Sequence, residues 1–158
     1  MLEIRPISEQ DRVWIEALLR EHWGSAIQVT RGRLHDASRL PGYVAVYHHE
    51  RAGLITYRVE GNAYEIITLD SLVEGQGLGT ALVQAVREAA FEAGCKRLWL
   101  ITTNENLTAL RFWQKRGFSL VRVHRNAVAD SRRLKPEIPL TGEHGIPIRD
   151  EIELEIIL

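Results

Sequence analysis

The chain has 158 residues, a formal net charge of −1 and a single cysteine, and 45% of its residues are apolar. A chain of this length buries roughly 70% of its unfolded surface, which suffices for a core without a metal or a disulfide. It has no basic stripe of the kind that binds nucleic acid, no apolar run near the roughly 20 residues that cross a bilayer, and no signal-peptide pattern after Met1. We therefore expect one cytoplasmic domain, residues 1–158, with no membrane or nucleic-acid partner.

The first half of the chain predicts a strand, a capped helix and an antiparallel meander. Ser8 and Asp11 are placed to cap a helix whose apolar residues recur at helical spacing up to about Trp23. Residues 25–41 look irregular or partly helical, with a turn at 31–33. Alternating apolar runs and a Gly61-Asn62 turn then predict successive strands. The predicted strands lie at 2–6, at 43–48, at 53–59 and from the Gly61-Asn62 turn to about Leu69.

The second half alternates helices and strands. Between 77 and 93, apolar residues three and four apart predict a helix with one buried face. A strand at 97–102, a helix from about 106 to Gly117 and a strand to 123 follow. In the last strand, 151–158, three glutamates alternate with apolar residues, which predicts one wet and one buried face. We interpret this strand as a solvated edge of the sheet rather than as a carboxylate site for a cationic substrate.

Residues 68–83 run from an apolar strand, through a loop with glycines at 75, 77 and 79, into an amphipathic helix. Glycine lets the backbone turn its N–H groups inward, and a helix start adds unpaired N–H groups and a positive dipole end. This combination predicts a phosphate or pyrophosphate site. A P-loop would need Lys and then Ser or Thr after its last glycine, and a dinucleotide fold would need G-x-G-x-x-G early in the chain. Neither pattern is present, and a plain connecting turn is the remaining alternative.

A second segment, Asn104 to Phe118, follows the strand at 97–102. It has the pattern of a helix cap, a short helix and a glycine stop before another strand. Together the two segments resemble the GNAT superfamily of N-acetyltransferases. Glu74 to Gly79 is similar to the pyrophosphate loop of that family, while Asn106, Ala109 and Gly117-Phe118 are similar to its second motif.

The resemblance implies an α+β (mixed α/β) fold: a mostly antiparallel central sheet of six to seven strands, flanked by helices and splayed in mid-sheet at the coenzyme site. It also implies transfer of an acetyl group from acetyl-CoA, without a metal, to a primary amine of a small molecule or a peptide. The amine would attack directly in a ternary complex. By the resemblance, the residues expected to bind the coenzyme are Leu69, Asp70, Ser71, Glu74, Gly75, Gln76, Gly77, Leu78, Gly79, Thr80, Asn104, Asn106, Ala109 and Trp113.

Two positions depart from the family pattern. The first loop position, usually Arg or Gln, is Glu74, whose carboxylate cannot attract phosphate by its charge. Backbone N–H groups must then carry the contact. The helix position where the family often has a Tyr, suspected of protonating the departing thiolate, is Trp113. An indole donates a hydrogen bond but is no general acid near neutral pH, so we assign none.

Two residues are candidates for the chemistry. By the resemblance, the strand before the loop binds the pantetheine arm, and the N–H of Leu69 is a candidate oxyanion donor. Glu65 lies four residues earlier, so we expect it on the same strand face, where a buried carboxylate with a raised pKa can accept the ammonium proton. A purely structural Glu65 is an open alternative. The competing bases are Tyr57, Tyr64, His22, His35, His124 and His144.

Residues 125–149 form a stretch too long for a simple hairpin. Loops of that length are usually functional or disordered, but the scattered apolar residues argue against disorder. We expect either an ordered flap over the acceptor pocket or a packed surface excursion. Cys95 has no histidine near it in sequence, so an inert, buried cysteine is favoured over an acyl-cysteine mechanism.

Three functions remain from different classes. An amine acetyltransferase is favoured. A non-catalytic acyl-CoA-binding module would bind the coenzyme without turnover, and a protein-interaction domain that keeps only the fold would not bind it. The nature of the acceptor and the oligomeric state cannot be predicted from these residues.

Overall fold

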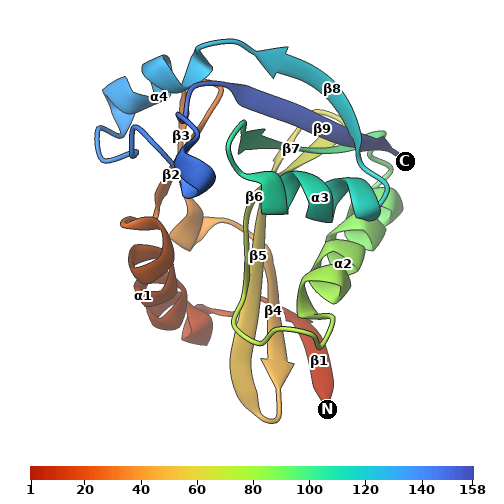
Figure 1. Cartoon of the computed structure of the whole chain (residues 1–158). Helices are drawn as coiled ribbons and strands as arrows, with labels where there is room; N and C mark the ends of the chain where they lie inside the picture. Colours follow the sequence, from red (N-terminus) through yellow and green to blue (C-terminus); the bar gives the residue numbers. More distant parts are fainter.

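A computed structural model describes all 158 residues. Its main feature is a seven-stranded sheet in the order β1-β4-β5-β6-β7-β9-β8, in which β6 and β7 form the only parallel pair (Figure 1). The expected α+β, mostly antiparallel fold is confirmed. The strands of this sheet are β1 (Leu2–Pro6), β4 (Gly42–Tyr47), β5 (Glu50–Glu60), β6 (Ala63–Ser71), β7 (Arg97–Thr103), β8 (Ser119–His124) and β9 (Glu151–Ile157).

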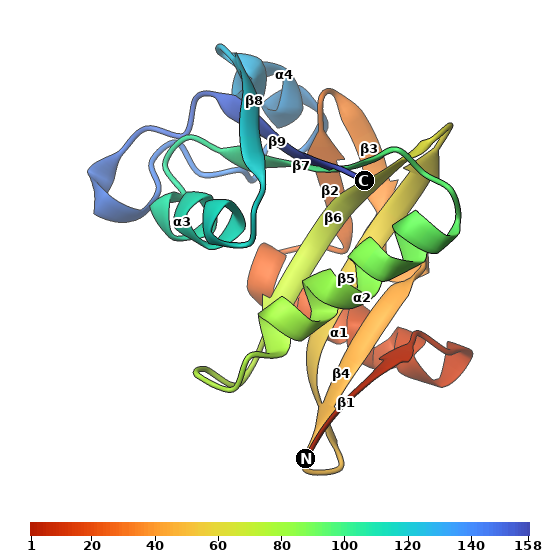
Figure 2. The ribbon, with the colours of Figure 1, turned by 90° about the vertical axis from the view of Figure 1, so that its right-hand side faces the viewer.

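Helices cover both faces of the sheet. Figure 2 shows α2 (Leu78–Glu92) in front of the sheet and α1 (Arg12–Trp23) behind it. We call these sides the α2 face and the α1 face. α3 (Leu107–Lys115) packs on the α2 face, and the short hairpin of β2 (Ile27–Thr30) and β3 (Arg33–Asp36) lies on the α1 face. α4 (Ala127–Leu134) packs against β2. None of these helices is long and apolar enough to cross a membrane.

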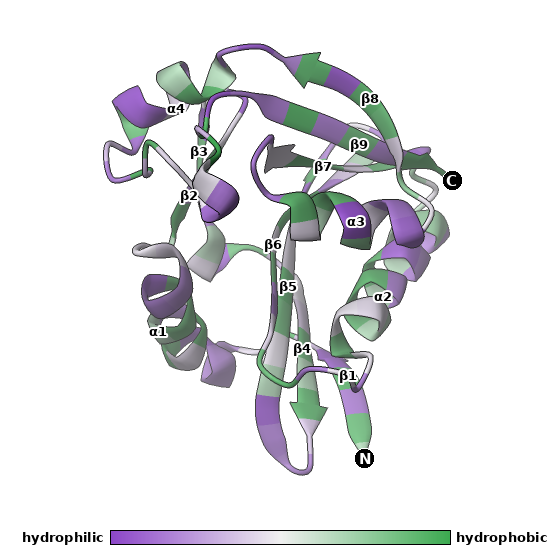
Figure 3. Cartoon of the chain, in the orientation of Figure 1, coloured by the Kyte–Doolittle hydropathy of each residue, from purple (hydrophilic) through white to green (hydrophobic).

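Two apolar cores follow from this layering. Both α1 and α2 carry hydrophilic and hydrophobic residues in alternation, as helices that cover a sheet with one side do (Figure 3). The larger core lies on the α2 face and includes Leu82, Val86 and Trp113. The smaller core lies on the α1 face, where Ile15 and Leu19 of α1 contact the sheet.

The sheet divides in the middle. β6 and β7 pair only over Ala63–Ile66 and Arg97–Leu100. Beyond these residues β6 continues beside β5, while β7 continues beside β9. The predicted mid-sheet splay is confirmed, and it begins directly after Ile66.

The structure overturns one expectation about a single segment and adds to two others. The stretch 25–41 has the expected turn and a short 3-10 helix at Ala37–Arg39, but it also contains the β2–β3 hairpin, whose turn residues Arg31 and Gly32 both have positive φ, as a two-residue type I′ turn requires. β9 is not a solvated edge, because it lies between β7 and β8, and Glu151 is 2% exposed. The stretch 125–149 contains a helix, α4, that no sequence pattern had predicted.

A β-bulge reverses the predicted orientation of Glu65. The register of β5 and β6 passes from Thr56 opposite Thr68 to Tyr57 opposite Ile66, so Ile67 is an extra residue. An extra residue shifts the alternation of side chains by one. Leu69 therefore packs into the core of the α2 face, while Glu65 contacts the hairpin on the α1 face. The expectation that the two share a face was wrong.

A buried carboxylate joins α1 to the sheet. Asp11 is fully buried and accepts hydrogen bonds from Arg5 on β1 at 2.8 and 2.9 Å and from Arg51 on β5 at 2.8 Å. It also accepts one from the N–H of Ser8, at 2.7 Å, in the predicted helix cap. This cluster fixes the start of α1, and therefore the direction in which its last residues point.

Replacing Asp11 by Asn should lower the free energy of unfolding by about 2–4 kcal/mol at pH 7, because two guanidinium groups lose their charged partner. The bonds from Arg5, with those from Ser8 and Arg51, hold the pKa of Asp11 well below its usual range. That contribution is present above the unfolded pKa of about 4 and is lost as pH falls toward the folded pKa. Urea unfolding at pH 7 and pH 3 measures it.

The exposed Asp130 pairs with Arg133 on one helix, so Asp130→Asn is the matched control and should change stability by less than about 0.5 kcal/mol. Equal stability of wild type and Asp11→Asn at pH 7 would contradict the anchoring role.

Candidate functional site

The glycine loop between β6 and α2 has the geometry expected of an anion site. Gly75 and Gly77 have positive φ, at 73° and 74°, and Gly77 is the N-cap of α2. The first helical hydrogen bond runs from Ala81 N–H to the Gly77 carbonyl, at 3.0 Å. The N–H groups of the first turn, from Leu78 to Thr80, precede that bond and point out of the helix end. Glu74 is exposed and has no ion-pair partner.

A cleft of about 340 Å³ opens where β6 and β7 part. Its walls come from β6, β7 and α3, with contributions from α2 and from the end of α1. Of the predicted residues, it brings together Leu69, Ser71, Gly79, Asn106, Ala109 and Trp113. The other lining residues are Trp23, Ile66, Ile67, Thr68, Leu100, Ile101, Thr102, Thr108 and Phe112. Glu65 and Asn104 are not among them.

Trp113 has one open polar group. It is 6% exposed, and its ring makes edge contacts with Phe112 and Phe118 at centroid distances of 5.0 and 5.1 Å. Its indole N–H donates to no acceptor in the chain, and the nitrogen is not fully buried. Trp113 also lines the cleft, so a ligand there would contact this side chain.

The two asparagines have different roles. Asn106 Oδ1 accepts from the N–H of Ala109 at 3.1 Å, so it caps α3 as predicted. Asn104 instead donates to the carbonyl of Pro147 at 2.9 Å and accepts from the N–H groups of Arg149 and Asp150, both at 2.9 Å. It joins the turn after β7 to the segment before β9 and does not tie down β6.

Asp70 turns its side chain toward α1. Its Oδ1 lies 3.1 Å from His22 Nδ1 and accepts from the Trp23 indole at 3.1 Å. Burial raises the pKa of Asp70, and the bonds from Trp23 and His22 oppose this. The side chain of Asp70 is therefore engaged by α1, and Asp70, which lies opposite Leu54 of β5, does not line the cleft. The hydrogen bond to Asp70 holds Trp23 at the cleft. No motif in the sequence had indicated that Trp23 belongs to the site.

Glu65 is held by the hairpin. Thr30 donates its hydroxyl proton to Glu65 Oε2 at 2.8 Å, and His35 Nε2 lies 2.8 Å from the same hydroxyl oxygen. Burial raises the pKa of Glu65, while Thr30, Arg58 and Arg33 act in the opposite direction. Glu65 Oε1 accepts no hydrogen bond from the chain, and this oxygen is not fully buried. The carboxylate thus keeps one oxygen free.

The competing bases differ in their surroundings. Tyr57 and Tyr64 stack on the α2 face at 4.6 Å, and burial raises the pKa of Tyr57 to about 12. Burial lowers the pKa of His35 to about 4, so it stays neutral near pH 7. His124 is paired with Glu153 at 2.9 Å. These contacts leave Glu65 and the His22–Asp70 pair as the groups with free polar atoms beside the α1 face.

Residues 125–149 are ordered by their own contacts. Lys135 donates to the carbonyls of Trp23 and Ile27 at 3.3 and 2.9 Å, which joins the end of α4 to the end of α1. Arg132 donates to three carbonyls within the segment, including that of Ile148 at 2.7 Å. The segment therefore lies next to Trp23, at the border of the cleft.

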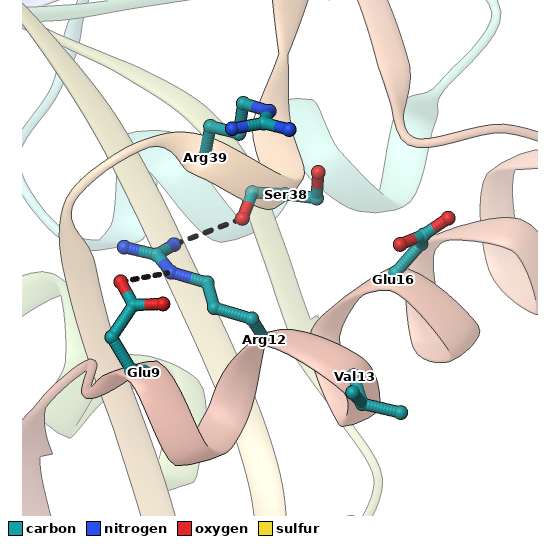
Figure 4. Close-up of a pocket in the computed structure, with 6 residues that line it drawn as sticks. All are labelled: Glu9, Arg12, Val13, Glu16, Ser38 and Arg39. Atoms are coloured by element: carbon teal, nitrogen blue, oxygen red, sulfur yellow. Dashed lines mark hydrogen bonds and ion pairs between the residues drawn. The ribbon is translucent and has the colours of Figure 1, made fainter.

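A second hollow, of about 320 Å³, lies between the start of α1 and residues 38–39 (Figure 4). Arg12 spans it and donates to the carbonyl of Ser38 at 2.9 Å. Arg12 Nε also forms an ion pair with Glu9 Oε1 at 3.9 Å. The hollow shares no residue with the cleft. Cys95 is buried in the core of the α2 face and lines neither the cleft nor the second hollow.

Comparison with known sequences identifies relatives along nearly the whole chain. A model of the acetyltransferase (GNAT) family matches residues 4–118. The uncharacterized protein YdhI of Bacillus subtilis (strain 168) is 44% identical over 153 residues, which cover 96% of each chain. The uncharacterized protein YxbD of the same organism is 43% identical over 154 residues, which cover 97% of each chain.

Solved structures share the fold. An IAA acetyltransferase from Bacillus cereus has a TM-score of 0.76 at 21% identity, with 100% of both chains covered. A Bacillus subtilis acetyltransferase in complex with CoA has a TM-score of 0.72 at 20% identity over 100% of this chain and 99% of that one. A GNAT family acetyltransferase from Elizabethkingia anophelis with acetyl-CoA bound has a TM-score of 0.70 at 21% identity over 99% and 98%.

Replacing Asn104 by Ala should loosen the segment before β9 without unfolding the protein. Each lost hydrogen bond contributes about 1 kcal/mol, so hydrogen exchange at Arg149 and Asp150 should speed up roughly tenfold or more. The exposed pair Gln84–Glu88 on α2 supplies the control Gln84→Ala. Unchanged exchange at both amides would show that Asn104 does not hold this segment.

Proposed function

Because the chain belongs to the GNAT acetyltransferase family, we propose that it transfers an acetyl group from acetyl-CoA to a primary amine of a small-molecule or peptidyl acceptor. The observation that carries this proposal is the cleft between the parted strands β6 and β7, next to the glycine loop at the start of α2. Thioester and amine would meet in this cleft, and the amine would attack directly in a ternary complex.

The coenzyme would bind along β6. Its pyrophosphate would lie on the N–H groups from Gly75 to Thr80, where the helix dipole favours negative charge. The pantetheine arm would enter the cleft between Ser71 and Ala109, beside strand edges that have no partner beyond Ile66. CoA or acetyl-CoA is bound in two of the structures with the same fold, which supports this arrangement.

The chemistry needs a polarised carbonyl and a neutral amine. The N–H of Leu69, in the wall of the cleft, is our candidate donor to the developing oxyanion. Trp113 offers a further N–H to the sulfur or carbonyl side without serving as an acid. The free Oε1 of Glu65 is our candidate acceptor for the ammonium proton, directly or through a water.

The acceptor would approach from the α1 face. The bulge at Ile67 turns Glu65 toward that face, away from α2 and α3, which leaves the two substrates on opposite sides of the sheet. Trp23 and the neighbouring end of α4 would form the wall of the acceptor site. In this arrangement residues 125–149 act as a fixed flap over the acceptor.

Saturating acetyl-CoA should raise the melting temperature by roughly 5–10 °C, because a ligand at 100 times its Kd stabilises by about 2.7 kcal/mol. Gly77→Ala should reduce this shift, since it disturbs the loop. Gly61→Ala is the matched control: both glycines have positive φ and open space around the missing Cβ, but Gly61 lies in the β5–β6 turn. No shift at millimolar coenzyme would favour an interaction domain that keeps only the fold.

Replacing Glu65 by Gln should lower kcat roughly 100-fold or more and remove the acidic limb of the pH–rate profile. The carboxylate must be ionised to accept a proton, so kcat/KM of the wild type should fall as pH drops through the raised pKa of Glu65. Glu50→Gln, at an exposed carboxylate at the start of β5 that forms no ion pair, is the control.

A Glu65→Gln enzyme with unchanged turnover and profile would exclude this base. Coenzyme binding without turnover on any amine in either protein would favour the non-catalytic acyl-CoA-binding module.

A further inference from the structure

An arginine from α3 lies at the start of α2. Arg116, the C-cap residue of α3, donates from Nε and Nη2 to the hydroxyl oxygen of Thr80 at 3.1 and 2.8 Å. Thr80 belongs to the first turn of α2, directly after the glycine loop. The third nitrogen, Nη1, reaches only the Phe112 carbonyl, at 3.4 Å. The guanidinium is therefore fixed beside the turn whose N–H groups lack partners.

Its position depends on close packing between two helices. Arg116 Cζ lies 4.1 Å from the centre of the Phe112 ring. The same ring packs against Gly79, where an added Cβ would lie 3.3 Å from ring atoms Cε1 and Cζ. Gly79 has no positive φ, so the space it leaves, rather than its backbone, matters here. The third glycine of the loop thus allows α3 to bring Arg116 over the helix start.

The charge of Arg116 is not neutralised within the chain. Arg5, Arg51 and Arg97 each form ion pairs with buried or half-buried carboxylates. Arg116 forms no ion pair, and its fork contacts only a hydroxyl and a carbonyl. A guanidinium held in one place without a counter-ion is suited to an anionic ligand, because it presents several donors in a fixed plane.

We propose that Arg116 binds the diphosphate of coenzyme A together with the N–H groups of the glycine loop. It supplies from α3 the positive charge that Glu74 does not supply from the loop. The inference rests on the proposed function, since it assigns a ligand to that same site. The diphosphate is favoured over the 3′-phosphate because Thr80, the anchor of Arg116, lies in the same helical turn as the free N–H groups.

The test is calorimetric titration of the full chain with CoA and with dephospho-CoA, for wild type, Arg116→Gln, Arg116→Lys and Arg111→Gln. Loss of charge-assisted hydrogen bonds should weaken binding roughly 10- to 100-fold for Arg116→Gln. Arg116→Lys should lie in between, because the charge remains without the planar fork. Arg111 is exposed on the same helix, so Arg111→Gln is the matched control and should bind like the wild type.

Salt dependence separates a charge contact from a structural one. Wild-type affinity should fall more steeply between 50 and 500 mM NaCl (concentrations on the order of those that screen exposed charges) than the affinity of Arg116→Gln. If Arg116→Gln loses affinity equally for CoA and for dephospho-CoA, the diphosphate contact is supported. If it loses affinity for CoA alone, the diphosphate assignment is overturned in favour of the 3′-phosphate.

Unchanged CoA affinity in Arg116→Gln would overturn the proposal and leave the proposed function intact. A wild type that binds neither form would overturn both. Melting curves without ligand show whether Arg116→Gln is folded; if it is not, Arg116→Lys carries the comparison.

Discussion

The loss of pairing between β6 and β7 after Ile66 and Leu100 is the constraint on which the site depends. Two parallel strands that stay together would fill the sheet and leave no opening. Because they part, backbone groups of both strands face a cleft instead of each other, and α3 and Trp113 form one of its walls. Unpaired backbone donors and acceptors are costly unless a ligand or water satisfies them. The extended, amide-containing coenzyme of the proposed function would supply such partners.

The bulge at Ile67 decides what each side of the opening can do. It directs Leu69 to the α2 face and Glu65 and Asp70 to the α1 face. Each of the two carboxylates is then held by an element outside the sheet, Glu65 by the hairpin and Asp70 by the end of α1. The strand therefore has an apolar side, where the proposed function places the pantetheine arm, and a polar side, where it places the amine.

The proposed phosphate site draws on residues distant in sequence. The glycine loop supplies N–H groups, but the only fixed cation at the start of α2 comes from the far end of α3. Phe112 and Gly79 bring the two helices close enough for this contact. A carboxylate at position 74 is compatible with this arrangement because positive charge arrives from another element.

Local patterns determined the glycine loop, the caps of α1 and α3 and the buried face of α2, because glycine conformation, capping and helical spacing act within a few residues. The splay of the sheet was predicted only because the two motifs resemble those of a known family. The β2–β3 hairpin escaped prediction although its Arg31-Gly32 turn was visible, because its strands are short and form a separate sheet. Only the tertiary structure decided the bulge at Ile67, the inner place of β9 and the partners of Glu65, Asp70 and Arg116. Each depends on contacts between distant segments, which no local spacing encodes.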